Sequence, residues 1–202
     1  MTMPVRKPTF ILCRTNAPLV TMAFDLIKQG RNIRIKIMGR DIAKQMKDLI
    51  GEILEFRRKA SIQEFNICLD GWLNAIRTEW QEKEGGEEII AEAVDQHTCL
   101  KVIAQNCVDT DDLLKKIDNL FVDTDAPDDP DTIYFASGHR SKGLERKRVI
   151  ILHPELCPHP NASRAEDIEQ EEHIWYVMLT RCGGEGKERE DSELIICHDQ
   201  RP

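Results

Sequence analysis

The sequence lacks the features that would assign it to a membrane, to secretion or to thiol chemistry. No apolar run approaches the length that crosses a bilayer, and the opening MTMPVRKP has no apolar region of the kind a signal peptide carries. The seven cysteines form no CxxC pair, and several lie in apolar runs, where a thiol behaves as a small hydrophobic side chain. We therefore expect a cytoplasmic protein that makes no membrane contact.

The chain also lacks an excess of basic residues. It has 36 acidic and 28 basic side chains, which give a formal charge of -8. This balance excludes a wholly basic nucleic-acid binder but permits a local basic groove. At 202 residues the chain can form one sizeable domain, or one domain with an insertion, but two full enzymatic domains would be a tight fit.

Short apolar runs predict an α/β fold with a parallel sheet. TFILC (9–13) has strand length, residues 17–27 have helical spacing with Pro18 in the first turn and Gly30 as a cap, and IRIKI (33–37) alternates as a second strand. A strand, a helix and a strand in so short a segment favour a right-handed parallel crossover. Further strands are predicted at 132–136, 149–152 and 193–197.

The middle of the chain has no strand signal. Amphipathic helices are predicted there, because apolar residues recur at steps of three and four over 41–60, 61–84, 87–106 and 110–121. The Pro- and Asp-rich segment 123–131 is typical of an irregular connection. We therefore predict one discontinuous α/β domain, 1–40 and 123–202, interrupted by a helical insertion at 41–122.

A last helix is predicted before the final strand. Ser163 and Glu166 have the spacing of a capping box, which predicts that the helix begins there. Ile168, Trp175 and Leu179 then lie on one helical face.

Three stretches, in this order, resemble parts of the UvrD/Rep-like superfamily 1 DNA helicases. ILCRTNAPL (11–19) resembles the opening of the second RecA-like motor domain, SGHRSKGLE (137–145) the fifth conserved motif, and EQEEHIWYVMLTR (169–181) the sixth. The resemblance covers the chain in outline. It implies a RecA-like sheet, as in P-loop NTPases but without the P-loop, with a small helical insertion.

The resemblance also implies a nucleotide half-site that takes ATP. Arg181 matches the family's arginine finger, whose fixed charge neutralises the transferring phosphoryl group. Glu145 matches an acid that accepts a hydrogen bond from the ribose, and Gly143 lets the backbone approach the nucleotide. Lys142, beside them, adds positive potential.

A contact with single-stranded DNA is implied as well. Arg14, Thr15 and Asn16 match the family's strand contacts, and Ser137 and His139 match residues that link the DNA track to the nucleotide. Contacts of this kind with phosphates would not depend on base sequence.

The sequence departs from a complete motor in several ways. It has no GxxxxGK[ST] and no strand that ends in paired acids, so we expect this chain alone not to hydrolyse ATP. The phosphate-binding loop and the magnesium ligands are expected from an N-terminal RecA-like domain, in cis or in trans. Arg146 stands where the family has an aromatic or acidic residue, and His173 where a second arginine is common. The helical insertion is also much shorter than the family's accessory subdomain.

Alternative interpretations remain open from the residues alone. Arg181 would also suit a helix C-terminus as a cation that stabilises the helix dipole, and Asn16 would suit the N-cap of the helix that follows it. The whole chain could be a non-catalytic DNA- or protein-binding module derived from a helicase.

A metal site is a further alternative, which we do not favour. His153, Cys157 and His159 have ligand chemistry, with Cys182 as a fourth donor, but their spacing fits no familiar zinc signature. We expect no metal there.

Overall fold

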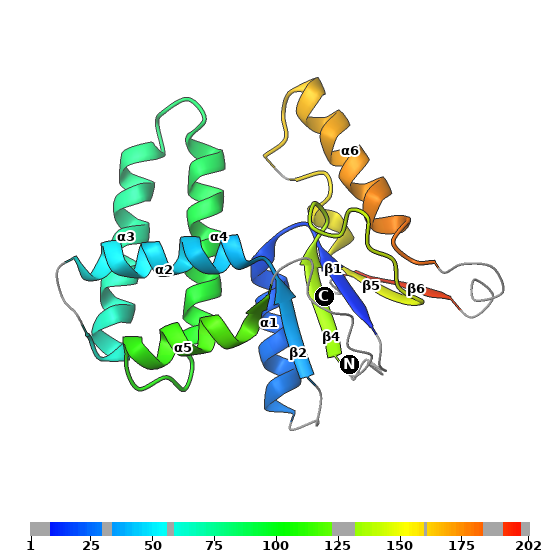
Figure 1. The fold of residues 1–202 in the computed structure, drawn as a ribbon. Coiled ribbons are helices and arrows are strands. Elements are labelled where there is room, and N and C mark those ends of the chain that lie inside the picture. The colour runs from blue at the N-terminus through cyan, green and yellow to red at the C-terminus, as the bar shows by residue number, and fades with distance from the viewer. Residues whose placement is uncertain are drawn as a thin grey trace. The chain divides into compact units, whose positions relative to one another are not determined.

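The computed structural model describes residues 9–29, 34–55, 59–122, 132–159, 161–183 and 192–198. The chain divides into two compact units, one made of residues 1–38 and 123–202 and the other of residues 39–122 (Figure 1). The division predicted from the sequence placed its boundaries after residues 40 and 122.

A parallel sheet flanked by helices confirms the predicted fold class, and all its strands except β3 belong to the first unit. The strand order is β3-β2-β4-β1-β5-β6, and the pairs β2–β4, β4–β1, β1–β5 and β5–β6 are all parallel. The strands are β1 (Phe10–Cys13), β2 (Arg34–Met38), β3 (Phe121–Val122), β4 (Thr132–Ser137), β5 (Arg148–Leu152) and β6 (Glu193–Cys197). Every residue of β1 and β4 is buried, as continuous apolar runs in a doubly covered sheet should be.

Two helices connect strands of this sheet. Helix α1 (Asn16–Lys28) joins β1 to β2, and helix α6 (Ala165–Leu179) joins β5 to β6 after the short 3-10 helix η1 (Pro154–Leu156). The two connections run toward opposite edges of the sheet, so right-handed crossovers place α1 and α6 on opposite faces. The N-cap of α1 is Thr15, one residue before the Asn16 alternative, and Gly30 lies outside the described residues.

The predicted start of α6 is wrong. Arg164 occupies the N-cap position and its Nε donates to Asp167 Oδ2 (2.9 Å), so Ser163 lies before the cap and the predicted capping box does not form. The residues buried along the helix are Glu171, Ile174 and Met178, whereas Ile168 is 38% exposed and Trp175 and Leu179 are half-buried. The buried face therefore includes an acid, which apolar spacing does not predict.

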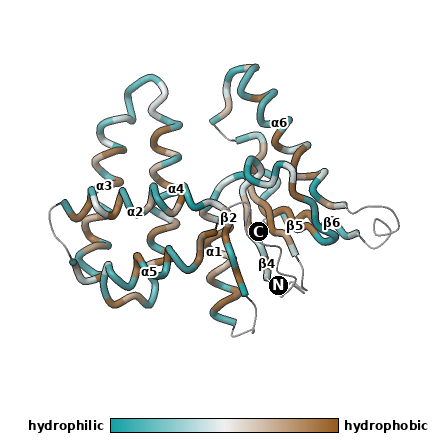
Figure 2. Tube along the Cα trace, in the orientation of Figure 1, coloured by the Kyte–Doolittle hydropathy of each residue, from teal (hydrophilic) through white to brown (hydrophobic). Residues whose placement is uncertain are grey.

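The second unit consists of helices, and β3 follows them directly. The helices are α2 (Arg40–Leu54), α3 (Ile62–Trp80), α4 (Gly86–Ala104) and α5 (Thr110–Leu120), close to the four predicted segments. Brown and teal alternate along α3 and α4, which is the amphipathic pattern seen in the sequence (Figure 2). Phe65, Leu69 and Leu100 are fully buried between them, and Asp70 of α3 binds His97 and Lys101 of α4 at 2.7 and 2.8 Å. Within the described ranges no helix is long and apolar enough to cross a membrane.

Candidate functional site

The five residues with predicted DNA roles lie at the carboxyl ends of two neighbouring strands. Cys13 of β1 pairs with Ser137 of β4, so the segments that follow each strand leave the sheet together. The Gly138 N–H donates to Cys13 O (3.1 Å), which joins the two turns directly. Ser137 is buried, His139 is exposed, and Arg14, Thr15 and Asn16 are half-buried. The structure thus brings together one predicted group of residues.

Arg14 forms a two-bond ion pair that the sequence analysis missed. Its Nε and Nη2 donate to Glu171 Oε2 and Oε1, both at 2.6 Å, and the Glu171 side chain is only 8% exposed. Glu171 Oε2 also accepts the backbone N–H of His159 (3.0 Å). The sequence contained one indication that Glu171 is buried. Glu171 lies three residues before Ile174 and seven before Met178, which is the spacing of a single buried helical face.

This ion pair sets the protonation of its neighbours. Burial acts to raise the pKa of Glu171, but the hydrogen bond and charge of Arg14 outweigh it, and the net pKa is lowered. Partial burial and the charge of Arg14 lower the pKa of His139, and Glu171 opposes that shift. Burial and the charge of Glu171 raise the pKa of Cys157 to about 11. At neutral pH the group therefore holds an ionised acid, a mostly neutral imidazole and an unreactive thiol.

Glu171→Gln should lower the free energy of unfolding by roughly 2 kcal/mol at neutral pH, because one charged acceptor of the Arg14 fork is lost. The folded pKa of Glu171 is lowered, so its stabilisation is present above the unfolded pKa and is lost as the pH falls through the folded value. Urea titrations of both proteins from pH 7 down to about pH 3 should show the difference shrinking with acidification. A difference that stays constant across that range would contradict the assignment.

The loop after β4 carries the predicted nucleotide contacts. Ser141 is fully buried and its hydroxyl donates to Gly138 O (2.8 Å), while the Leu144 N–H donates to Ser141 O (3.1 Å). Gly143 has φ +82°, a conformation that favours glycine. Lys142, Gly143 and Glu145 are exposed, so a ligand could reach all three.

Arg181 fastens the end of α6 to this loop. Its Nε donates to Val177 O (2.8 Å) in the last turn, and its Nη1 donates to Leu144 O (3.3 Å) and Ser141 O (3.5 Å). Main-chain bonds strengthen the join, because the Arg146 N–H donates to Arg181 O (3.0 Å) and the Gly183 N–H to Arg146 O (3.1 Å). The structure therefore brings Arg181 together with the loop that carries Lys142, Gly143 and Glu145. The bond to Val177 also gives Arg181 its alternative role at the helix C-terminus.

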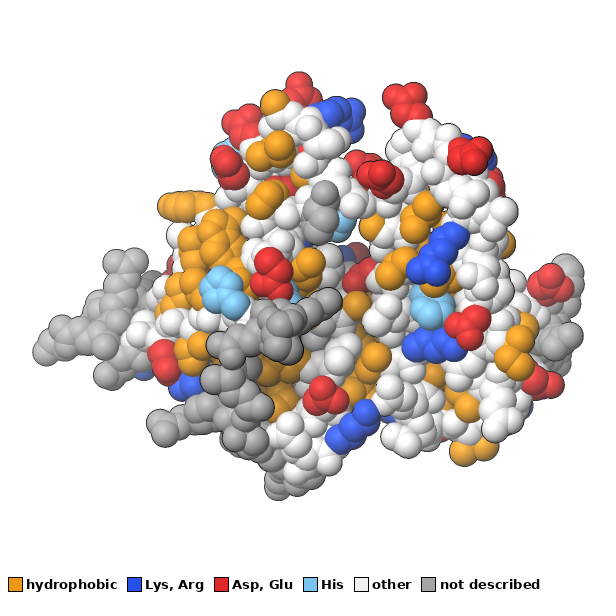
Figure 3. Space-filling view, turned by 180° about the vertical axis from the view of Figure 1, so that it is seen from behind, with side chains coloured by type: hydrophobic (Ala, Val, Ile, Leu, Met, Phe, Trp, Pro, Cys, Tyr) orange, Lys and Arg blue, Asp and Glu red, His pale blue; other side chains and the backbone are white. Residues whose placement is uncertain are grey.

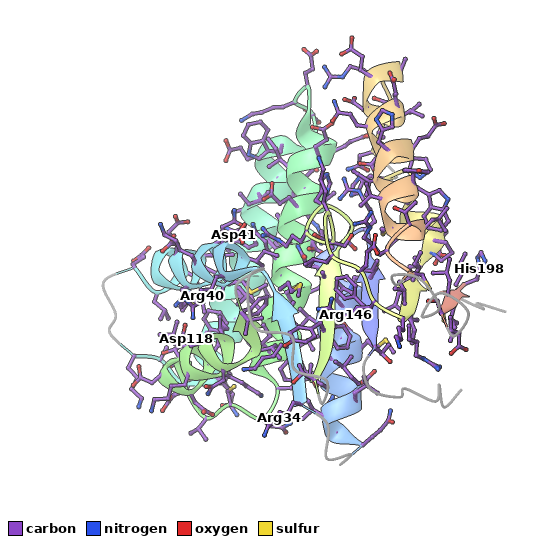
Figure 4. The ribbon with its side chains drawn as sticks, turned by 45° about the vertical axis from the view of Figure 1, so that its right-hand side comes forward. Arg34, Arg40, Asp41, Asp118, Arg146 and His198 are labelled. Atoms are coloured by element: carbon purple, nitrogen blue, oxygen red, sulfur yellow. The ribbon has the colours of Figure 1, made fainter. Side chains whose placement is uncertain are left out.

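Arg146 has a packing role at a position where the resembled family differs. Its Cζ lies 5.8 Å from the ring centroids of both Phe10 and Tyr134, which are partners in the β1–β4 register (Figure 4). The guanidinium thus covers an aromatic pair, a contact that a lysine would make less well.

The candidate metal ligands make hydrogen bonds within the protein, and Cys157 and His159 both bond to Glu171. His153 Nδ1 lies 2.9 Å from Glu155 Oε1, and the Cys157 and Cys182 thiols donate to the carbonyls of Glu171 and Lys147. Among the residues that the structure describes, no group of three or more His, Cys, Asp or Glu side chains could hold a metal.

The helical unit has a shallow cavity of about 650 Å³ between α2 and α5. Arg40, Lys44 and Lys47 line it with Asp41 and Asp118 (Figure 4). Lys47 binds Asp118 at 2.6 Å, so charges of both signs meet there, and we assign it no ligand. On the face drawn in Figure 3, the acidic and basic side chains of the coloured residues are likewise interspersed, with no broad basic area.

No family model matches this sequence, and no curated protein matches it. The functional assignment therefore depends on the arrangement of the side chains.

Proposed function

We propose that this chain is the C-terminal motor half of an ATP-dependent single-stranded-DNA translocase or helicase that acts in the cytoplasm. In this proposal it supplies an arginine finger, a ribose contact and strand contacts. The phosphate-binding loop and the magnesium ligands belong to an N-terminal RecA-like domain, in the same chain or another.

One observation carries this proposal: Arg181 is bonded to the loop that presents Gly143 and Glu145. A nucleotide half-site of this type needs a fixed cation next to an exposed carboxylate and a closely approachable backbone. These groups come from segments 36 to 38 residues apart in the sequence, so their meeting is a property of the fold. Their chemistry fits a nucleoside triphosphate, with a carboxylate for ribose hydroxyls and cations for phosphates.

The roles of the chain's own residues follow from their positions. Glu145 would accept a hydrogen bond from the ribose, and Lys142 would add positive potential beside it. Arg181 would stabilise the charge that builds up on the phosphoryl oxygens once the neighbouring domain closes over the site. Bound ATP supplies the chemical energy. The turn at Arg14–Asn16, with Ser137 and His139, would hold the strand through phosphate contacts.

A non-catalytic DNA- or protein-binding module is the second candidate. One observation favours it: the nitrogens of Arg181 already donate to the Val177, Ser141 and Leu144 carbonyls and to the Thr180 hydroxyl. Such bonding suits a purely structural arginine. As a finger, Arg181 would need to exchange some of these bonds for phosphate oxygens.

ATP hydrolysis by the purified chain, with and without single-stranded DNA, tests the proposal. We expect DNA binding in an anisotropy assay that weakens with salt, and no turnover above background. Adding a domain with a phosphate-binding loop should give turnover that depends on Arg181 if the chain is a motor half, but none if it is a binding module. DNA-stimulated turnover by the chain alone, lost in Arg181→Ala, would overturn the half-motor assignment.

A further inference from the structure

Helix α6 connects the two groups of candidate residues. Glu171, in its second turn, holds Arg14 at the carboxyl end of β1, and Arg181, just after its last turn, holds the carbonyls of Ser141 and Leu144. Ten residues at about 1.5 Å each separate Glu171 from Arg181, a span of roughly 15 Å. A side chain in the middle of this helix and one just beyond its C-terminal end therefore bind different parts of the candidate site.

Between Glu171 and Arg181 the helix is tightly packed against the loop after β4. A Cβ on Gly138 would lie 2.6 Å from Ile174 Cγ2 and 3.1 Å from Met178 Cγ. A side chain there would force Ile174 or Met178 to shift, and Met178 is 1% exposed. Close-packed surfaces of this kind leave little room for the helix to shift without the loop.

The geometry at Glu171 fixes the Arg14 guanidinium in one orientation. The carboxylate takes the edge formed by Nε and Nη2, which leaves Nη1 as the one nitrogen of Arg14 not bonded to Glu171. With the His159 amide, the carboxylate receives charge-assisted bonds from two other segments of the unit. Glu171 itself is 6% exposed, so it acts through Arg14 and not by touching a ligand.

We propose that Glu171 is a positioning residue that locks Arg14 to helix α6, so that the strand-contact turn and the Arg181 end of the helix shift together. The proposal rests on the proposed function for the roles of Arg14 and Arg181. The ion pair that locks Arg14 to Glu171 lies within this chain, as does its effect along α6. Both can therefore be tested without DNA or nucleotide.

The first experiment titrates His139 by NMR in the purified chain. His139 interacts with the charges of Arg14, Glu171 and Arg140, and the variants change only Arg14 and Glu171. Glu171→Gln should lower the pKa of His139 further, because Glu171 is the one neighbouring group that raises it. Arg14→Gln should raise the pKa of His139. Glu172→Gln makes the same charge change on an exposed neighbour in α6 and is the control. Equal shifts in Glu171→Gln and Glu172→Gln, or none in either, would overturn the lock.

Amide exchange measures whether the effect reaches the far end of α6. The Arg146 N–H donates to Arg181 O (3.0 Å), so its exchange rate reports on that end. We expect exchange there to accelerate several-fold in Glu171→Gln and to stay unchanged in Glu172→Gln. An unchanged rate in Glu171→Gln would overturn the coupling along the helix.

Binding of single-stranded DNA by the same variants separates position from charge. If Glu171 orients Arg14, then Glu171→Gln and the charge-preserving Arg14→Lys should each weaken binding by about tenfold at physiological salt. If Arg14 acted only as a charge, Glu171→Gln would tighten binding and Arg14→Lys would change nothing, and the proposal would be wrong. If the wild-type chain did not bind DNA, the proposed function and the strand-contact role would both be wrong. The pKa of His139 in the variants would still test whether Glu171 holds Arg14.

Discussion

Arg181→Ala should reduce ATP turnover of a reconstituted two-domain motor by a factor on the order of 10³, with little loss of DNA affinity. A guanidinium supplied to a transferring phosphoryl group stabilises charge that exists mainly in the transition state, so its removal lowers kcat far more than it weakens binding. Arg14 binds Glu171 and not Arg181, so the substitution removes no proposed strand contact. Steady-state turnover at saturating DNA measures the effect.

The substitution also removes bonds within the fold, so its controls matter. Arg181 donates to Val177 O and to the loop carbonyls of Ser141 and Leu144, and losing these bonds should cost about 1–3 kcal/mol of stability. Thermal unfolding must therefore show that the variant is folded at the assay temperature. Arg164→Ala, at the opposite end of α6 where the side chain is 78% exposed, is the matched control and should leave turnover unchanged. Turnover of Arg181→Ala within about threefold of wild type would refute the finger role.

The sequence could predict those strands and helices whose apolar pattern lies within one short segment. β4 and β6 coincide with their apolar runs to within a residue, although only β4 is buried along its whole length. The four helices of the insertion follow from apolar periodicity in the same way. The two-residue β3 was missed, since a strand so short has no pattern of its own.

A Ser followed three residues later by a Glu forms a capping box at the start of one helix but not at the start of another. Ser61 and Glu64 have the spacing of a capping box and form one, with the Ser61 N–H on Glu64 Oε2 (3.0 Å) and the Glu64 N–H on Ser61 Oγ (3.3 Å). Ser163 and Glu166 have the same spacing, but α6 begins at Ala165 and its first turn is closed by Arg164 and Asp167. The spacing alone therefore does not determine where a helix begins.

The central interaction of the candidate site lay beyond any local pattern. Arg14 and Glu171 are 157 residues apart, so only the sheet order brings them together. The resemblance implied that Arg14 has a role but named no partner for it. Glu171 was missed because a charged residue on a helix is normally assigned to the solvated face, and it is buried here only because its partner neutralises it.

Gly86→Ala should destabilise the helical unit by more than about 3 kcal/mol. Gly86 begins α4 directly beside the end of α3, and a Cβ there would lie 1.8 Å from the backbone oxygen of Trp80. A main-chain carbonyl cannot rotate away as a side chain can, so the connection between α3 and α4 would have to reopen. That would disturb the hairpin that the contacts of Asp70 with His97 and Lys101 hold together.

Gly71→Ala is the matched control for this prediction, because the same substitution in the interior of α3 meets nothing within 4 Å. It should stabilise the unit by about 0.5–1 kcal/mol, since alanine restricts the unfolded chain and favours helix more than glycine does. Urea denaturation followed by circular dichroism should therefore give midpoints on opposite sides of the wild-type value. If both variants shifted the midpoint in the same direction, the close approach of α4 to Trp80 would not be the reason for glycine at position 86. The conformational preference of glycine would then be the reason.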